Sequence, residues 1–214
     1  MPAEALVFDA YGTLFDVHSV AARCESSWPG KGLRLWQLWR AKQLEYTWQR
    51  SLMQRYAPFS TVTREALAYS CEALGLELSV AQMEGLMSEY LSLATYPDVA
   101  PTLGKLGKKQ AILSNGSPDM LLPLVKNSGL RFDAVISVDE LKVFKPAPQV
   151  YELATKKLGT EKGEIAFVSS NCWDALGAKS YGFSVYWINR GNAPLDRLGF
   201  KPDRVLKSLD EILQ

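Results

Sequence analysis

Residues 5–16 have the sequence ALVFDAYGTLFD, in which a short apolar run ends on the charged residue Asp9. A run of this length is typical of a strand that is buried on both faces of a sheet. The carboxylate of Asp9 then lies at the carboxyl end of the strand, where parallel sheets bind their ligands. The stretch therefore predicts a central strand with a reactive group at its end.

The next segment, residues 17–95, contains no convincing strand, and its apolar residues recur at helical spacing. Ser79 is followed three residues later by Gln82, a capping-box pattern that starts the last helix of the segment. We therefore expect only helices directly after the first strand. Breaks between these helices are expected near residues 29–32, 57–61 and 75–79.

After Pro97, apolar runs alternate with helical patterns. This alternation predicts a parallel sheet with helices on both faces. The expected fold class is α/β, a Rossmann-like parallel-sheet core with an all-helical cap inserted after the first strand. The later strands are expected over 111–114, 134–138, 165–169 and 183–188, and the helices over 121–128, 148–158 and 173–181.

The first strand has to pair with strands that follow the helical segment, so the core is discontinuous in sequence. We assign residues 1–15 and 96–214 to the core and residues 16–95 to the cap. Because the cap follows the strand that ends at Asp9, we expect it to cover the carboxyl edge of the sheet as a lid.

Polar groups follow the expected strands at the same edge. Asp9 ends the first strand, Ser114 and Asn115 end the second, and residues 169–174 follow a later one with the sequence SSNCWD. Lys145 precedes the helix expected at 148. Because the carboxyl ends of parallel strands meet at one edge, we expect these groups to converge there.

The motifs FDAYGTLFD at 8–16, SNG at 114–116, KP at 145–146 and SSNxxD at 169–174 resemble those of the haloacid dehalogenase superfamily. The resemblance is closest to its L-2-haloacid dehalogenases and covers nearly the whole chain, in the family's motif order. It implies hydrolytic dehalogenation of short-chain L-2-haloacids to D-2-hydroxyacids through an aspartyl ester.

Two positions differ from the magnesium-dependent phosphatases of the same superfamily. Tyr11 stands where those enzymes carry a general acid–base aspartate, and Asp174 is the only carboxylate where they carry an acidic cluster. Mg²⁺ prefers carboxylates and waters as ligands, whereas Lys145 offers a positive charge near Asp9. The sequence therefore predicts an enzyme that uses no metal and no cofactor.

The residue types suit a two-step displacement. An ionised Asp9 displaces halide from carbon and forms an ester, and Asp174 is the one candidate base in the last motif for the water that cleaves it. The resemblance adds Arg40 and Tyr151 to the active site. The expected catalytic residues are Asp9, Thr13, Arg40, Ser114, Lys145, Tyr151, Ser169, Asn171 and Asp174.

The resemblance also implies a halide cradle and an apolar wall around the substrate. Arg40, Asn115 and Trp173 match the family's halide positions, and backbone amides near Ser117, at the start of a helix, are suited to bind the substrate carboxylate. The expected substrate- and halide-binding residues are Tyr11, Arg40, Leu44, Phe59, Ser114, Asn115, Ser117 and Trp173.

Composition excludes several other kinds of chemistry. One histidine, His18, is too few for a multi-histidine metal site, and the three cysteines contain no C-x-x-C pair. The formal net charge of +1 gives no general attraction to nucleic acid or membranes. Residues 23–64, however, contain eight basic and two acidic residues, so we expect this stretch of the cap to supply positive charge over the site.

The expected partners are a small haloacid substrate, water and the halide product, with no nucleic acid and no membrane. We expect no signal peptide or membrane span, and the unpaired cysteines suit the cytoplasm. Four tryptophans between residues 28 and 48 favour a homodimer formed through the cap. Two alternatives remain open: a magnesium-dependent phosphatase of the same superfamily, and a non-catalytic binding protein on this fold.

Overall fold

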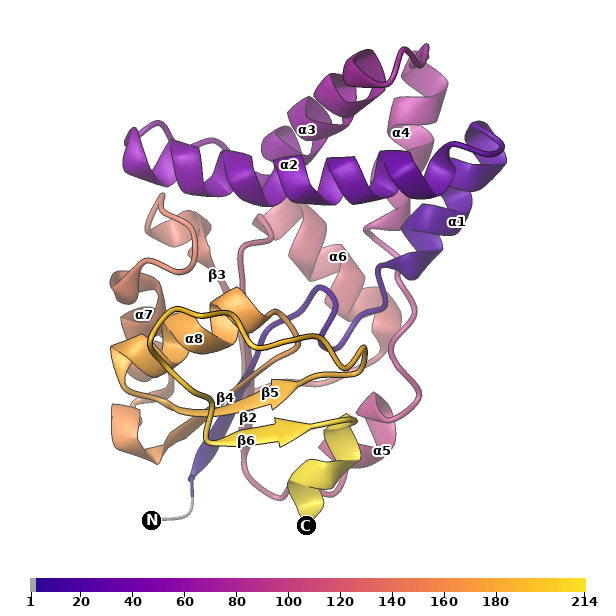
Figure 1. Cartoon of the computed structure of the whole chain (residues 1–214). Helices are drawn as coiled ribbons and strands as arrows, with labels where there is room; N and C mark the ends of the chain where they lie inside the picture. Colours follow the sequence, from indigo (N-terminus) through magenta and orange to yellow (C-terminus); the bar gives the residue numbers. More distant parts are fainter. Residues whose placement is uncertain (1–2) are drawn as a thin grey trace.

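The computed structural model describes residues 3–214 and contains one parallel sheet with the strand order β3-β2-β1-β4-β5-β6 (Figure 1). Strand β1 lies between β2 and β4, and all four of its residues are buried. Its apolar run is therefore the centre of the core, as the sequence predicts. The strands are β1 (Ala5–Phe8), β2 (Lys109–Ser114), β3 (Ala134–Ser137), β4 (Ile165–Ser169), β5 (Ser184–Ile188) and β6 (Arg204–Leu206).

Helices cover both faces of this sheet, which confirms the predicted α/β class (Figure 1). Helices α7 and α8 pack against each other, and α8 also contacts β4 and β5. Helix α6 contacts β3, and α5 contacts the 3₁₀ turn η3 near the C-terminus. The helices of this layer are α5 (Val99–Leu103), α6 (Pro118–Ser128), α7 (Pro148–Leu158) and α8 (Cys172–Tyr181), and the turns are η1 (Val138–Glu140), η2 (Lys162–Glu164) and η3 (Leu209–Leu213).

Four more helices form a separate layer above the carboxyl ends of the strands (Figure 1). The long helix α2 crosses this layer and packs against both α1 and α3. The capping box of Ser79 and Gln82 is present at the start of α4. The helices are α1 (His18–Ser27), α2 (Gly32–Leu52), α3 (Phe59–Ala73) and α4 (Val80–Glu89), and the gaps between them fall at or beside the expected breaks.

The helical layer joins the sheet through two neighbouring chain segments. The amide of Asp16 donates to the carbonyl of Ala94, and the amide of Tyr96 donates to the carbonyl of Leu14. The Arg190 guanidinium pairs with Asp98 at 2.7 Å and lies over the ring of Tyr96, 4.2 Å from its centroid, so a core residue fixes the return segment.

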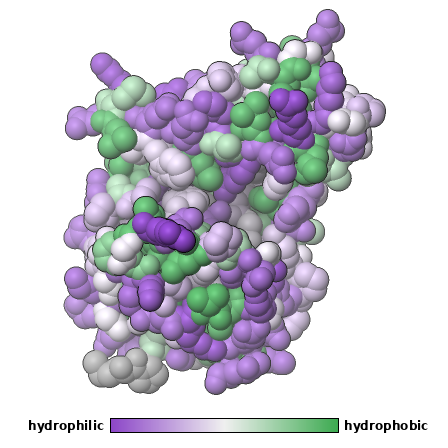
Figure 2. Space-filling view, viewed as in Figure 1, coloured by the Kyte–Doolittle hydropathy of each residue, from purple (hydrophilic) through white to green (hydrophobic). Residues whose placement is uncertain are grey.

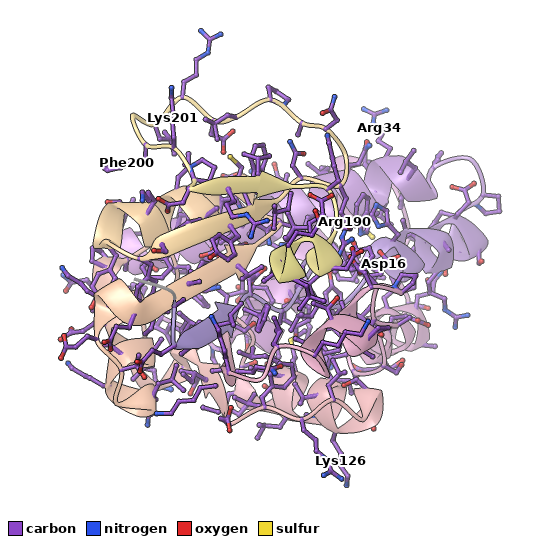
Figure 3. The ribbon with its side chains drawn as sticks, turned by 90° about the horizontal axis from the view of Figure 1, so that it is seen from below. Asp16, Arg34, Lys126, Arg190, Phe200 and Lys201 are labelled. Carbon is purple, nitrogen blue, oxygen red and sulfur yellow. The ribbon has the colours of Figure 1, made fainter. Side chains whose placement is uncertain are left out.

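Two elements were not expected from the sequence. Strand β6 is short, lies at the edge of the sheet and is only partly buried, so it carries no apolar periodicity. Helix α5 has five residues, too few to show a helical pattern. The loop between β5 and β6 extends outward at Phe200 and Lys201 (Figure 3).

The surface mixes hydrophobic and hydrophilic residues. In the space-filling view the hydrophobic residues lie in separate groups among hydrophilic ones (Figure 2). Within residues 3–214, no helix combines the length and the apolar character that crossing a membrane requires.

Gly32, the first residue of α2, lies directly on the backbone of α1. Its amide donates to the side chain of Glu25 at 2.9 Å, and a Cβ at this position would overlap backbone atoms of Cys24 and Glu25. Overpacking of this kind costs about 1–3 kcal/mol. We therefore expect Gly32→Ala to lower the free energy of unfolding by about that amount, measured by chemical denaturation. Gly191→Ala is the control, because no atom lies within 4 Å of its Cβ position; equal effects of the two substitutions would contradict the packing argument.

Candidate active site

The carboxyl ends of the strands and the underside of the helical layer border a small cavity. Its walls come from the loops after β1, β2 and β4, from the loop before α7, and from α2, α3 and α8. Every lining residue is one that the sequence analysis singles out. They are Asp9, Tyr11, Arg40, Leu44, Phe59, Ser114, Asn115, Lys145, Asn171 and Trp173.

The carboxylate of Asp9 is held from several directions, and the residue is only 6% exposed. Its Oδ2 accepts hydrogen bonds from Thr13 Oγ1 at 3.0 Å and from Asn171 Nδ2 at 2.8 Å. Its Oδ1 accepts one bond, from Lys145 Nζ at 3.2 Å. Because Oδ2 is engaged by two donors and Oδ1 by one, Oδ1 is the oxygen that keeps a lone pair for attack.

Lys145 is almost completely buried, with 1% of its surface exposed, and its ammonium bridges two carboxylates. Nζ donates to Asp174 Oδ2 at 2.8 Å as well as to Asp9. Burial lowers the pKa of Lys145, but the carboxylates of Asp174 and Asp9 oppose it and raise the pKa above its usual value. The residue is therefore a cation at neutral pH. Its backbone amide donates to Asn115 Oδ1 at 2.9 Å, which ties its loop to the end of β2.

Asp174 lies behind Lys145 and does not line the cavity. Its carboxylate is fully buried and accepts bonds from Lys145, from Tyr151 Oη at 2.8 Å and from Ser169 Oγ at 3.2 Å. Burial, reinforced by the charge of Asp9, raises the pKa of Asp174 to about 6. Tyr151 and Ser169 thus contact Asp174, and neither reaches the cavity wall.

Thr13 has its hydroxyl proton directed at Asp9 by a neighbour that the sequence analysis did not select. The amide of Ser170 donates to Thr13 Oγ1 at 2.8 Å, so the threonine oxygen accepts there and donates to Asp9. Ser170 Oγ in turn donates to the carbonyl of Gly12 at 2.7 Å. Ser170 is the second serine of the SSN motif, so its place in that motif was the sequence signal that could have identified it.

The two serines that follow β2 have different positions. Ser114 lines the cavity, and its Oγ accepts from the amide of Gly116 at 3.0 Å, which leaves its proton free for a ligand. Ser117 does not line the cavity; its hydroxyl oxygen accepts from the amide of Ser60 at 3.1 Å and so joins α6 to α3. Pro118, which follows it, has no N–H to offer an anion.

Aromatic rings and two unpartnered polar atoms form the opposite side of the cavity. The rings of Tyr11 and Phe59 stack with centroids 6.0 Å apart, and Trp173 meets Trp48 edge to face at 5.6 Å. Burial raises the pKa of Tyr11 far above its usual value, so it is a neutral phenol. Among residues 3–214, the hydroxyl of Tyr11 and the Nε1 of Trp173 are buried without a hydrogen-bond partner. Such groups are costly unless a ligand satisfies them.

The positive charge expected from residues 23–64 does not extend to the helical layer as a whole. Residues 16–95 contain eight basic and eight acidic side chains, because Asp16 and five acids beyond residue 64 balance the six excess basic residues of the stretch. Arg50 pairs with Glu65, and Arg64 pairs with Glu84. Positive charge above the cavity comes instead from Arg40, for which no ion pair is found within the described chain.

Comparison with known proteins agrees with this arrangement. A family model described as a haloacid dehalogenase-like hydrolase matches residues 3–182. The chain belongs to this family. It is 47% identical to an (S)-2-haloacid dehalogenase from Pseudomonas sp. (strain YL), across 99% of this chain and 93% of that one.

Two solved structures resemble this haloacid dehalogenase-like hydrolase along its whole length. The L-2-haloacid dehalogenase RSc1362 has a TM-score of 0.98 at 45% identity and covers 100% of this chain and 98% of its own. An L-2-haloacid dehalogenase from Xanthobacter autotrophicus was solved with chloropropionic acid covalently bound. It has a TM-score of 0.92 at 46% identity and covers 98% of this chain and 96% of its own.

The raised pKa of Asp174 predicts how the stability of this hydrolase depends on pH. The folded protein holds this proton more tightly than the unfolded chain, where the ordinary value is 3.8. The resulting stability is complete below pH about 4 and is lost as pH rises through about 6. Between pH 4 and 7, the free energy of unfolding should therefore fall by roughly 2–3 kcal/mol relative to Asp174→Asn.

Urea unfolding of both proteins at a series of pH values measures this difference. Carboxyls with lowered pKa values, such as Asp98, cancel because both proteins contain them. A difference that is independent of pH, or that changes in the opposite direction, would contradict the placement of Asp174.

Proposed function

We propose that this enzyme hydrolyses the carbon–halogen bond of short-chain L-2-haloacids to give D-2-hydroxyacids, through an ester on Asp9. The observation that carries the proposal is the setting of Asp9: a buried carboxylate, one oxygen of which accepts a single hydrogen bond, in a small cavity that is also lined by the cationic Arg40. The names of its relatives and the covalently bound chloropropionic acid in one of them support the same reaction.

In the first step, Asp9 Oδ1 attacks the halogen-bearing carbon in line with the leaving group. A carbon–oxygen bond forms, the carbon–halogen bond breaks, and the halide takes the bonding pair. In-line attack inverts the carbon, so an L-2-haloacid yields a D-product. Thr13, Asn171 and Lys145 hold the carboxylate in the orientation that this attack requires.

The halide leaves towards Arg40, Asn115 and Trp173. All three line the cavity, and the buried Trp173 N–H, which has no partner within residues 3–214, is a donor that an anion would satisfy. The substrate carboxylate then lies near the free proton of Ser114. Tyr11, Leu44 and Phe59 contact the alkyl group.

In the second step, water attacks the carbonyl carbon of the ester and regenerates Asp9. We assign the proton from this water to Asp174, since a carboxylate with a pKa of about 6 is suited to accept a proton near neutral pH. Ser169 donates to Asp174, and its Oγ also accepts from the amide of Asn171, so this serine connects the cavity wall to the base. Tyr151 fixes the other carboxylate oxygen.

We propose that the reaction needs no metal, since the Lys145 ammonium already lies between Asp9 and Asp174 and neutralises charge there. We further propose a cytoplasmic homodimer. Cys24, Cys71 and Cys172 are free thiols, in keeping with a reducing compartment. At the end of α2, Leu52 is 86% exposed and the adjacent Met53 is also exposed, which offers an apolar contact in the helical layer.

The proposal is tested by halide release from L-2-chloropropionate with and without EDTA. Release should persist in EDTA, and Asp9→Asn should reduce it by roughly a thousandfold or more, because the nucleophile is lost. Asp210→Asn, which alters an exposed carboxylate, should leave the rate unchanged. Full turnover by Asp9→Asn would contradict the proposal. Magnesium-dependent release of phosphate from a phosphate ester, without halide release, would favour the phosphatase alternative.

A further inference from the structure

Arg40 owes its position to a neutral side chain one turn away. Its Nη1 donates to Gln43 Oε1 at 2.6 Å, and within the described chain this is the hydrogen bond found for its guanidinium. Two other basic residues of α2 have carboxylate partners instead: Lys42 pairs with Glu45 and Arg50 with Glu65. Gln43 is completely buried, unlike a glutamine on a solvated helix face.

The orientation of the Gln43 amide is set by α3. Gln43 Nε2 donates to Thr63 Oγ1 at 2.7 Å, and the Thr63 hydroxyl donates to the carbonyl of Phe59 at 2.7 Å. Because the single proton of Thr63 goes to that carbonyl, its oxygen has to accept from Gln43. The amide therefore presents its NH₂ to Thr63 and its oxygen to Arg40.

The hydrogen bonds that link Arg40, Gln43, Thr63 and the carbonyl of Phe59 form a relay, and its surroundings are largely apolar. Thr63 is fully buried, the ring of Tyr90 lies edge-on to Trp39, and the indole of Trp39 donates to the carbonyl of Thr63 at 2.8 Å. Phe59, at the far end of the relay, lines the cavity. The relay thus fixes two parts of the cavity wall, the cation on α2 and the ring on α3, relative to each other.

The neutrality of Gln43 matters for an arginine that receives an anion. A carboxylate at the same position would form an ion pair with Arg40 and compete with halide for its charge. An amide oxygen fixes the guanidinium and leaves the charge available.

We propose that Gln43 is a positioning residue: oriented by Thr63, it aims Arg40 into the cavity and sets the affinity of the site for halide. The inference rests on the proposed function for the identity of the anion. It adds a determinant of leaving-group discrimination, because a poorer leaving group depends more on stabilisation of the departing halide.

The test compares Gln43→Glu, Gln43→Leu, Thr63→Val and the conservative Thr63→Ser. The measurements are kcat and KM for L-2-chloropropionate and L-2-bromopropionate, and the inhibition constant of chloride. Gln43→Glu keeps the acceptor but adds a charge, and the adjacent arginine keeps that carboxylate ionised. It should raise the inhibition constant of chloride about tenfold or more and lower kcat more for the chloro substrate than for the bromo substrate.

Gln43→Leu should show the same direction of change, Thr63→Val a smaller one, and Thr63→Ser values like the wild type. Thermal unfolding reports whether each variant is folded, and a purely structural role would not alter the ratio of chloro to bromo turnover. If the Gln43 variants do not fold, the inference is tested by comparing Thr63→Val with Thr63→Ser, of which only the first should change the chloride inhibition and the chloro-to-bromo ratio. Unchanged chloride inhibition and an unchanged ratio in folded variants would overturn the inference.

Failure of the proposed function gives a different result. In that case the wild-type protein releases no halide from either substrate. Chloride binding is then measured directly through tryptophan fluorescence, because Trp173 lines the cavity. Weaker chloride binding by Gln43→Glu than by the wild type would still support the role of Gln43, and equal binding would overturn it.

Discussion

The ammonium of Lys145, buried between the carboxylates of Asp9 and Asp174, is the interaction on which the active site depends. Its Nζ lies 3.2 Å from one carboxylate and 2.8 Å from the other. Three charges removed from water are stable together only when their geometry and remaining hydrogen bonds are well satisfied. The surrounding hydroxyls and amides meet this requirement, and they place the same carboxylate where it can attack a substrate.

This ion triad divides the site into two layers. The cavity layer contains Asp9 and Asn171, and the rear layer contains Asp174 and Tyr151. The rear layer needs close packing of α8 on α7: a Cβ at Gly177 would lie only 2.5 Å from Tyr151 Oη and 2.6 Å from Pro146 Cβ. Chemistry in the cavity thus depends on helix packing beneath it.

The sequence was enough to predict the sheet and the lining of the cavity, because each apolar run ends in polar residues at the same edge. The sequence did not predict which of the motif side chains line the cavity and which lie behind or beside it. Asp174 and Ser117 belong to motifs that reach the site, yet the directions of their side chains, set by tertiary packing, place them behind or beside the cavity. The role of Gln43 was not predictable either, because it depends on contacts between α2 and α3 that leave no local pattern in the sequence.

The central claim is that Asp9 becomes the covalent ester and that water attacks its carbonyl carbon. A single turnover with enzyme in excess over L-2-chloropropionate, carried out in water enriched in a heavy oxygen isotope, tests this directly by mass spectrometry. The account predicts heavy oxygen in the Asp9 peptide and ordinary oxygen in the new hydroxyl group of the product. Heavy oxygen in the product hydroxyl, with an unlabelled Asp9 peptide, would mean that water attacks the substrate itself and would contradict the account.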